Sequence, residues 1–320
     1  MSQLFQSSKT LEKLIQIIFS RMIKRTLFFG NPAYLSTKNE QLQISFPEPD
    51  KSDRTVPIED LGMIVLENQQ VTITHGLIAK LTDKKVAIVT CNSQHLPEGL
   101  LLPMHGHSEQ TERIRYQIQA SQPLKKNLWQ QTVSAKIQNQ AAHLKEKGKD
   151  SPRLHYLAKN VSSGDSGNHE AQAAAIYWQS LFDIPDFNRE QAGIPPNNLL
   201  NYGYAILRAV IARALVSSGM FPGLGIWHRN KYNAYCLADD IMEPYRPYVD
   251  LVVSHLVDTE DDISELTTEM KKELLSIPAL DVRIDGQKSP LMVAASRTTN
   301  SLFECFAGIS RKIIYPEYGG

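Results

Sequence analysis

The sequence predicts an α+β protein in which a small N-terminal β domain is followed by a larger all-α C-terminal domain. Three observations predict this order. Strand-like segments fill the chain from residue 22 to about residue 92, a segment with two prolines and two glycines follows, and apolar residues beyond it recur every three or four positions. A chain of 320 residues also exceeds the usual size of one domain.

The first 21 residues are expected to be an N-terminal extension. They hold one short apolar patch, LIQIIF at 14–19, after Glu12 and Lys13, and no small-residue cleavage site follows, which is unlike a signal peptide. An added amphipathic helix is the alternative. Since no apolar run elsewhere reaches about 18 residues, we expect a cytoplasmic protein without a membrane partner.

Residues 22–94 are predicted to form the β domain. Alternating apolar and polar residues flank the dipeptide Lys38-Asn39, which is typical of a hairpin turn. The segment 95–108, HLPEGLLLPMHGHS, is predicted to be a linker because proline and glycine favour irregular backbone.

Residues 109–320 are predicted to form the helical domain. Gly219 is expected to end one helix, and Pro278 with RIDGQKSP (283–290) predicts an interruption by a short hairpin. Apolar residues with helical spacing define six predicted helices: 111–121, 122–148, 168–182, 197–219, 233–257 and 296–314.

Composition limits the possible partners and the compartment. Lys plus Arg and Asp plus Glu number 34 each, so net charge does not indicate a polyanionic partner, and any nucleic-acid surface must be local. The three cysteines, Cys91, Cys236 and Cys305, are far apart and odd in number. This pattern suits a reducing cytosol, with the cysteines as buried small side chains.

One histidine and three acidic residues lie within the segment 224–247, LGIWHRNKYNAYCLADDIMEPYRP. In a helix, Asp240 and Glu243 are three residues apart, and Asp239 and Glu243 four apart, so each pair shares a face. Unpaired carboxylates repel one another, whereas a divalent cation binds them. Carboxylate oxygens with the imidazole of His228 suit Mg²⁺ or Mn²⁺.

The alternative is that these acidic residues form a solvated helix face and that His228 is an ordinary loop residue. Spacing alone favours this alternative, because acidic helix faces are common. The neighbouring side chains favour a buried site, since a desolvated carboxylate needs a partner. These neighbours are Trp227, Tyr232, Tyr235, Cys236, Leu237 and Tyr245.

Glu170 is a further candidate ligand, at the start of the predicted helix 168–182. Asp165, Ser166 or Asn168 can cap this helix. Glu170 falls in the first turn, where the helix dipole favours a carboxylate, and this dipole role is its structural alternative.

Six segments occur in a fixed order along the chain: RTLFFGNPAYL, LWQQTVSAKIQNQA, DSGNHEAQAAAIYW, NNLLNYGYAILRAVIARAL, LGIWHRNKYNAYCLADDIMEPYRPYVD and SLFECFAGISRKIIYPE. Together they resemble the CRISPR-associated integrase and endonuclease family, the Cas-one family, in the type II-C form found beside type II effector nucleases. The likeness covers about residues 22–315.

The resemblance implies a β domain that dimerises and an α-helical catalytic domain that holds one divalent metal, Mg²⁺ or Mn²⁺. The family's catalytic and metal-binding residues fall on Glu170, His228 and Glu243. Asp240 occupies the neighbouring acidic position, and Asp239 is a weaker candidate ligand. His228 as a general acid or base is a secondary hypothesis.

The activity implied by the resemblance is the insertion of short foreign DNA, the prespacer, into a CRISPR array by attack of a 3′ hydroxyl on a phosphodiester. The implied partners are double-stranded DNA of the prespacer and the repeat, a second copy of the chain, the small Cas-two protein in a heterohexamer, and the type II effector nuclease. A stand-alone structure-specific repair nuclease and a non-catalytic DNA-binding scaffold are the alternatives.

Basic side chains near the candidate ligands are expected to contact DNA phosphates. Arg246 has an alternative role as the partner of a structural ion pair, and Tyr232 is the tyrosine expected to stack on a base. The candidate DNA-binding residues are Arg229, Asn230, Lys231, Tyr232, Arg208, Arg213, Arg246 and Lys136.

Overall fold

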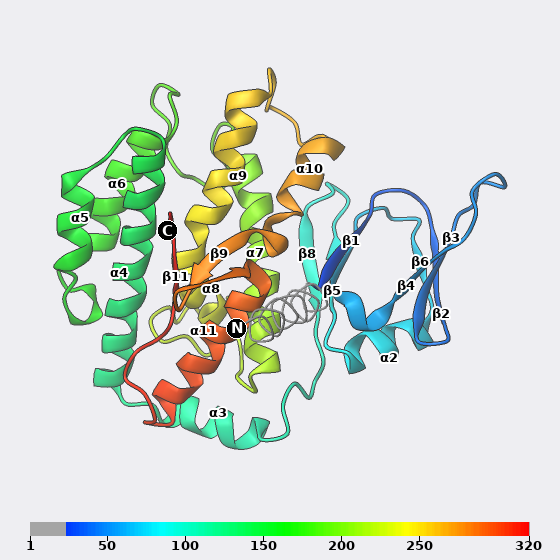
Figure 1. Ribbon diagram of the computed structural model, residues 1–320, viewed down its shortest axis with the longest axis horizontal. Helices are drawn as coiled ribbons and strands as arrows, with labels where there is room; N and C mark the ends of the chain where they lie inside the picture. Colours follow the sequence, from blue (N-terminus) through cyan, green and yellow to red (C-terminus); the bar gives the residue numbers. More distant parts are fainter. Residues whose placement is uncertain (1–23, 320) are drawn as a thin grey trace, which may run out of the picture.

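The computed structural model describes residues 24–319. A smaller β-rich part comes first in the chain and a larger, mainly helical part follows, side by side in Figure 1. The predicted α+β class and the order of its two parts are therefore confirmed.

The first sheet is mainly parallel and lies next to the helical part (Figure 1). β1 runs parallel to β5, β5 runs parallel to β7, and β8 pairs with β7 antiparallel. The run LGMIVL of β5 is apolar on both faces because both faces of this sheet are covered. In sheet order, the strands are β1 (Arg25–Phe29), β5 (Leu61–Leu66), β7 (Ala87–Cys91) and β8 (Pro97–Leu101).

The second sheet contains the predicted hairpin. Asn39 and Glu40 have positive φ angles of 51° and 57°, and they connect two antiparallel strands. The predicted hairpin is therefore confirmed, but its turn lies one residue later than Lys38-Asn39, because Lys38 still pairs with Gln41. In sheet order, the strands are β4 (Arg54–Pro57), β3 (Gln41–Ser45), β2 (Tyr34–Lys38) and β6 (Thr72–Ile73).

Two elements of this region differ from the sequence-based expectation. A helix, α2 (His75–Asp83), occupies a segment expected to be strand, and the side chain of Thr74 caps its N-terminus. Strand β8 lies inside the predicted linker 95–108. It is an edge strand, which explains why Pro97 and Gly99 are tolerated in it.

All six predicted helical segments contain helices. The predicted helix end at Gly219 is confirmed, because its φ of 74° directly follows the helix and its cap. Two short helices, α5 and α10, were not predicted. The helices are α3 (Gln110–Gln119), α4 (Gln122–Glu146), α5 (Pro152–Lys159), α6 (His169–Leu181), α7 (Asn197–Ser217), α8 (Cys236–Met242), α9 (Arg246–Thr259), α10 (Thr268–Leu274) and α11 (Leu291–Phe306).

The predicted helix 233–257 is interrupted. A short 3₁₀ segment, η3 (Glu243–Tyr245), separates α8 from α9. Pro244 and Pro247 lie at this junction, and proline cannot donate the backbone hydrogen bond that an uninterrupted helix needs. The other 3₁₀ segments are η1 (Ile58–Asp60), η2 (Ser163–Asp165) and η4 (Ile277–Ala279).

The helical part also contains a small sheet. The predicted hairpin at 283–290 is confirmed as β9 (Asp281–Ile284) paired with β10 (Gln287–Pro290). A third strand, β11 (Pro316–Glu317), brings the C-terminal segment back to β9. The part expected to be all-α is therefore mainly, but not purely, helical.

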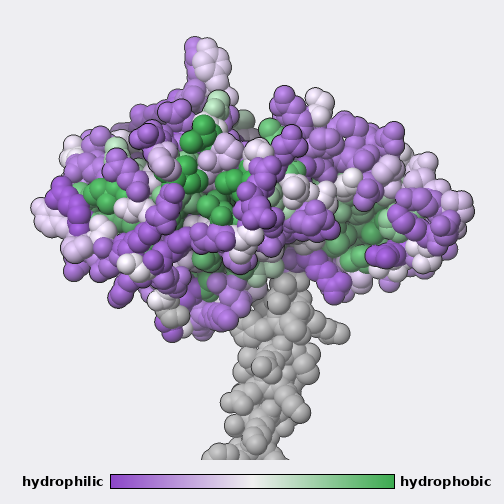
Figure 2. Space-filling model, turned by 90° about the horizontal axis from the view of Figure 1, so that it is seen from above, coloured by the Kyte–Doolittle hydropathy of each residue, from purple (hydrophilic) through white to green (hydrophobic). Residues whose placement is uncertain are grey.

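Two apolar cores hold the molecule together. The smaller core lies between the two sheets of the β part and includes Leu42, Leu61 and Leu77. The larger core runs through the helical part and continues onto the first sheet at Met63 and Val65. Helix α7 is long and apolar enough to cross a membrane by length and composition, but 72% of that window is buried within the protein. The face in Figure 2 is mainly hydrophilic, with apolar side chains grouped near the middle of the larger lobe.

Candidate metal and DNA site

Glu170 lies in the first turn of α6, and its backbone is fixed by Asp165. The Asp165 carboxylate accepts hydrogen bonds from the backbone N–H groups of His169 (2.8 Å) and Glu170 (3.0 Å). These N–H groups point out of the helix and have no partner within it. Of the three possible caps considered from the sequence, Asp165 is therefore the residue that fixes this helix start.

Glu170 and Glu243 meet at the ammonium group of Lys136. Lys136 Nζ lies 2.7 Å from Glu170 Oε1 and 2.6 Å from Glu243 Oε2. Arg246 Nη2 lies 2.9 Å from the other Glu243 oxygen, Oε1. Two carboxylates and two cations, from α4, α6 and the η3–α9 junction, thus form one compact cluster.

Burial and charge act in opposite directions in this cluster. Burial alone would lower the pKa of Lys136, but Glu243 and Glu170 outweigh it, so the pKa of the lysine is raised. Burial would raise the pKa of Glu243, yet Arg246 and Lys136 lower it. Both groups therefore remain charged near neutral pH.

His228 is held against Asp240 by the loop before α8. Its Nδ1–H donates to Asp240 Oδ1 at 2.5 Å, and the backbone N–H groups of Trp227 and His228 donate to the same carboxylate at 2.9 and 3.2 Å. The loop approaches this closely because Gly225 has no side chain: a Cβ there would collide with the carbonyl of His228 and lie 2.8 Å from Asp240 Oδ2.

The surroundings of His228 raise the pKa of its ring. The hydrogen bond to Asp240 raises the pKa of His228, partly opposed by burial, and the charges of Glu243 and Glu170 add to the rise. The ring also meets the buried Trp129 edge-on at 5.5 Å between centroids. Trp129 in turn stacks on Trp227, with centroids 5.5 Å apart and planes 3° apart.

Asp239 points to a different partner. It accepts a hydrogen bond from Arg208 Nε (2.6 Å) and another from the side chain of Asn233 (2.7 Å). The three acidic residues of this segment thus have different basic partners: Arg208 for Asp239, His228 for Asp240, and both Lys136 and Arg246 for Glu243. Glu243 therefore meets Glu170, through Lys136, rather than Asp240. Within residues 24–319, no three His, Cys, Asp or Glu side chains are grouped as a ready metal-binding set.

The candidate DNA-binding residues divide into exposed and internal groups. Tyr232 is 84% exposed, and Lys231 Nζ lies over its ring at 4.8 Å. Arg229 is also exposed and donates to Gln122. Arg213 instead donates to the backbone carbonyl of Lys85.

The side chains around the acidic segment, which were expected to be buried, differ in their exposure. Trp227, at 40% exposure, and Tyr232 lie at the surface, contrary to the expectation that the whole neighbourhood is buried. Cys236, Leu237 and Tyr245 are buried as expected. All three cysteines are buried and unpaired, which agrees with their expected role as small core side chains.

Two internal residues were not expected to have the roles that the structure gives them. Lys136 was considered only as a DNA contact, although it lies among the inward-facing residues Val133 and Ile137 of α4, and this position is the sequence feature that indicates burial. Asp250 on α9 accepts hydrogen bonds from Tyr177 (2.9 Å) and Tyr204 (2.5 Å). Arg246 lies over the ring of Tyr204 at 4.7 Å, which connects Asp250 to the cluster.

A cavity of about 480 Å³ opens beside His228. Most of the polar side chains that line this cavity are basic or carry an amide group. The polar residues that line it are Gln117, Gln122, Lys125, His228, Arg229, Asn230, Lys231 and Asn233.

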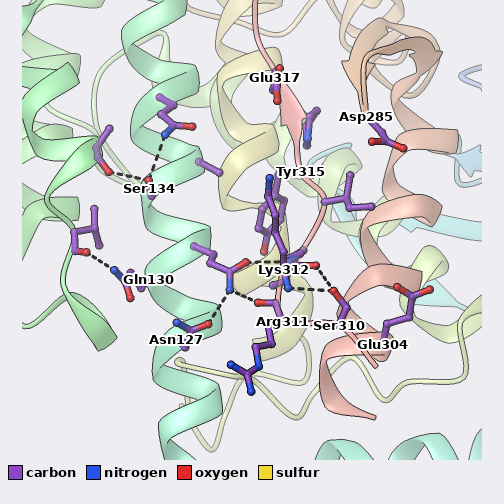
Figure 3. Close-up of a pocket in the computed structure, with 18 of the residues that line it drawn as sticks. Asn127, Gln130, Ser134, Asp285, Glu304, Ser310, Arg311, Lys312, Tyr315 and Glu317 are labelled. Carbon is purple, nitrogen blue, oxygen red and sulfur yellow. Dashed lines mark hydrogen bonds between the residues drawn. The ribbon is translucent and has the colours of Figure 1, made fainter. Parts of the chain in front are cut away.

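A larger groove of about 1090 Å³ lies elsewhere, between α4 and the C-terminal segment (Figure 3). Two of its polar side chains bond within the protein: Gln130 donates to Val161 O, and Ser134 donates to Ala158 O. None of Glu170, His228 and Glu243 lines it. His228 lines the smaller cavity, whereas Glu170 and Glu243 line neither, so His228 is the residue that connects the candidate site to a cavity.

Fold and site together define an α+β protein whose helical part holds a buried cluster of glutamates and basic side chains next to an exposed histidine. The family model described as CRISPR associated protein Cas1 matches residues 27–275. The chain is 39% identical over 282 residues to the CRISPR-associated endonuclease Cas1 of Neisseria meningitidis serogroup C (strain 8013), covering 88% of this chain and 91% of the relative. The chain belongs to the Cas1 family.

Solved structures share the fold at low sequence identity. A casposase bound to its integration product has a TM-score of 0.74 at 19% identity, covering 92% of this chain and 94% of the casposase chain. A chain of a Cas6-RT-Cas1–Cas2 complex has a TM-score of 0.69 at 19% identity, covering 93% of this chain and 37% of that chain. These similarities support the fold throughout the two parts of the chain.

Proposed function

We propose that this chain is a metal-dependent DNA endonuclease and integrase that inserts prespacer DNA into a CRISPR array. Membership of the Cas1 family supports the reaction class, since the Neisseria relative is named an endonuclease. The observation that carries the proposal is that Glu170 and Glu243, from distant parts of the chain, approach one cation position, the ammonium group of Lys136, and that the charges of both also raise the pKa of His228.

Two features of these residues support a divalent cation, although the proposed ligands are not grouped as a ready set among the described residues. Among the described residues, Glu243 Oε2 is a buried oxygen that accepts no well-directed hydrogen bond, although Lys136 Nζ is only 2.6 Å away. Asp240 engages Nδ1 of His228, so Nε2 is the ring nitrogen left to bind a ligand. Glu170, His228 and Glu243 are the proposed ligands. Asp240 is proposed to orient His228, because a carboxylate commonly accepts a hydrogen bond from the second ring nitrogen of a metal-binding histidine.

In the proposed reaction the 3′ hydroxyl of the prespacer attacks a phosphodiester of the array. One P–O bond forms, the bond to the old 3′ oxygen breaks, and that oxygen leaves as a hydroxyl, so the number of phosphodiesters is unchanged. Mg²⁺ or Mn²⁺, when bound, polarises the phosphoryl oxygen and stabilises the leaving oxygen. Arg229, Lys231 and Lys125 around the small cavity are the proposed phosphate contacts.

The proposed partners follow from the same family. Double-stranded DNA is the proposed substrate, and a casposase of the same fold is described as bound to an integration product. A homodimer and a Cas2 protein are proposed partners, because another structure with this fold is a Cas6-RT-Cas1–Cas2 complex. The type II effector nuclease remains a proposed partner on the resemblance alone.

A strand-transfer assay tests the proposal. The chain is mixed with a 3′-hydroxyl duplex and a plasmid that carries a leader and repeat, with and without the Cas2 partner and Mn²⁺. We expect joining that requires Mn²⁺ and that falls at least about a hundredfold in E170A, H228A and E243A, the scale of a lost catalytic group. K147Q is the control, because Lys147 caps the C-terminus of α4 and pairs with the exposed Asp258.

Two results would contradict the proposal. Cleavage without joining under all conditions would favour the stand-alone repair nuclease. Joining at the original rate in all three alanine variants would show that the cluster is structural, as in the DNA-binding scaffold.

A further inference from the structure

Lys136 lies at the point where a cation shared by Glu170 and Glu243 has to lie. Its side chain comes from the buried face of α4, and the residue is only 8% exposed. Burial of an isolated ammonium group costs free energy, and the two carboxylates offset this cost. The ammonium group in turn reduces the repulsion between the two carboxylates. The lysine is therefore a structural cation within the proposed metal site.

Both oxygens of Glu243 are in contact with a basic side chain. Arg246 Nη2 lies 2.9 Å from Oε1, and Lys136 Nζ lies 2.6 Å from Oε2. The cluster of Glu170, Glu243, Lys136 and Arg246 is thus formally neutral. Addition of a divalent cation to this arrangement would leave it with an excess of two positive charges in a buried place, which Coulomb repulsion strongly disfavours.

Of the two basic side chains, Lys136 is the one that is able to withdraw. The guanidinium of Arg246 is planar and lies over the ring of Tyr204 at 4.7 Å, while the Tyr204 hydroxyl is bound to the buried Asp250. Lys136 has a flexible four-carbon chain, and its ammonium group contacts only the two carboxylates within hydrogen-bonding or ion-pair distance among the described residues.

We propose that Lys136 is an internal competitor of the metal: its ammonium group occupies the shared position between Glu170 and Glu243, and it must withdraw before both carboxylates bind a divalent cation. Lys136 is a positioning residue in this role, because it keeps the two carboxylates at the spacing of one cation and sets the affinity for the metal. The inference rests on the proposed function, since it requires that the cluster bind a metal.

Calorimetric titration with Mn²⁺ tests this inference directly. K136Q removes the charge but keeps a polar side chain. We expect K136Q to bind Mn²⁺ about tenfold more tightly or better, the scale on which groups around metal ligands change metal affinity. Mn²⁺ should also raise the melting temperature of K136Q more than that of the unmodified protein. K147Q, which removes the half-buried lysine at the C-terminal cap of the same helix, should do neither.

The outcomes distinguish the inference from the proposed function. Unchanged or weaker Mn²⁺ binding by K136Q would overturn the competition. Absence of Mn²⁺ binding in both the unmodified protein and K136Q, or full binding retained in E243Q, would overturn the proposed metal site itself.

K136R provides a second test if K136Q does not fold. Its planar guanidinium retains the charge and binds carboxylates with two N–H groups, so it should compete more strongly and weaken Mn²⁺ binding. Mn²⁺ affinity of K136R equal to or above that of the unmodified protein would overturn the inference.

Discussion

At the scale of single residues, neighbouring acidic side chains have different partners. Asp239 binds Arg208, the buried Asp240 binds the exposed His228, and Glu243 binds Lys136 and Arg246. The exposed fractions of 8% for Asp239 and 0% for Asp240 show that both are shielded, so burial alone does not separate them. The two aspartates differ in their partners. The same substitution, aspartate to asparagine, is therefore expected to have different effects at the two positions.

D240N is expected to lower Mn²⁺ affinity about 10- to 100-fold, because the amide holds His228 less firmly than the carboxylate. Calorimetric titration with Mn²⁺ measures this change. D239N is the matched control, since Asp239 pairs with Arg208 and Asn233, and its affinity should stay close to that of the unmodified protein. Equal losses in the two variants would contradict the assigned role of Asp240.

His143 gives a prediction of pH dependence. It is buried, and burial lowers its pKa to about 4, with Lys147 adding to the effect. Since this pKa lies below the ordinary value of 6.5, the unfolded chain takes up the proton first as the pH falls. Stability that is present above pH 6.5 is therefore lost between pH 6.5 and about pH 4, by about 3 kcal/mol.

H143N should show a smaller loss of stability over the same pH range, because asparagine does not titrate. Urea unfolding at several pH values measures the free energy of unfolding of both proteins. Parallel pH curves would show that His143 does not titrate as its burial requires.

The site could be predicted from the sequence only in part. Glu170, His228 and Glu243 were candidates because of their residue types and the family resemblance, and Glu170 and Glu243 do meet at one point. Spacing could not reveal that Asp240 faces His228, because helix α8 ends at Met242 and the chain turns into a 3₁₀ segment. Nor could it reveal that a lysine from a distant helix lies between the glutamates.

At the scale of elements, Asp250 connects the helices that carry the site. Its carboxylate, on α9, accepts hydrogen bonds from Tyr177 on α6 and Tyr204 on α7. His143 on α4 is bound to the hydroxyl of Tyr177 at 2.8 Å. The helices that provide Lys136 and Glu170, together with α9 next to Glu243, are thus joined by one buried polar network.

Y177F should destabilise the protein by about 1–2 kcal/mol, because it leaves Asp250 and His143 each without one buried partner. Urea unfolding measures this cost. Y156F is a suitable control, since Tyr156 on α5 is 55% exposed, and its substitution should have little effect. A cost for Y177F no greater than that for Y156F would show that the network adds nothing to stability.

Elements with strong periodicity were the predictable ones. Helices α4 and α7 are long and regular, and their predicted ranges are close to the observed ones. Helix α2 was missed because nine residues within a β-rich region give too short a periodic pattern. Strand β8 was missed because its proline and glycine are typical of loops, and only its pairing with β7 makes it a strand.

At the scale of the whole molecule, the two parts are joined by apolar and charged contacts. Met63 and Val65 of the first sheet belong to the core of the helical part. Lys271 of α10 forms a buried ion pair with Glu67, which directly follows β5, and the two residues are 8% and 6% exposed. The β part therefore shares its interior with the helical part.

K271M should cost about 3–5 kcal/mol, because it leaves the carboxylate of Glu67 buried without its charged partner. The double variant E67L/K271M should recover much of this loss, since it removes both charges. Urea unfolding of the four proteins gives the coupling energy between the two residues. Additive costs would show that the ion pair does not connect the two parts.

The stacked tryptophans give the protein an internal optical reporter. Only three tryptophans are present, and two of them, Trp129 and Trp227, lie face to face beside the ring of His228. The third, Trp178, packs against Phe182 and Phe187 and can be replaced by phenylalanine to remove its emission. Fluorescence of W178F then follows events at His228 without any attached dye.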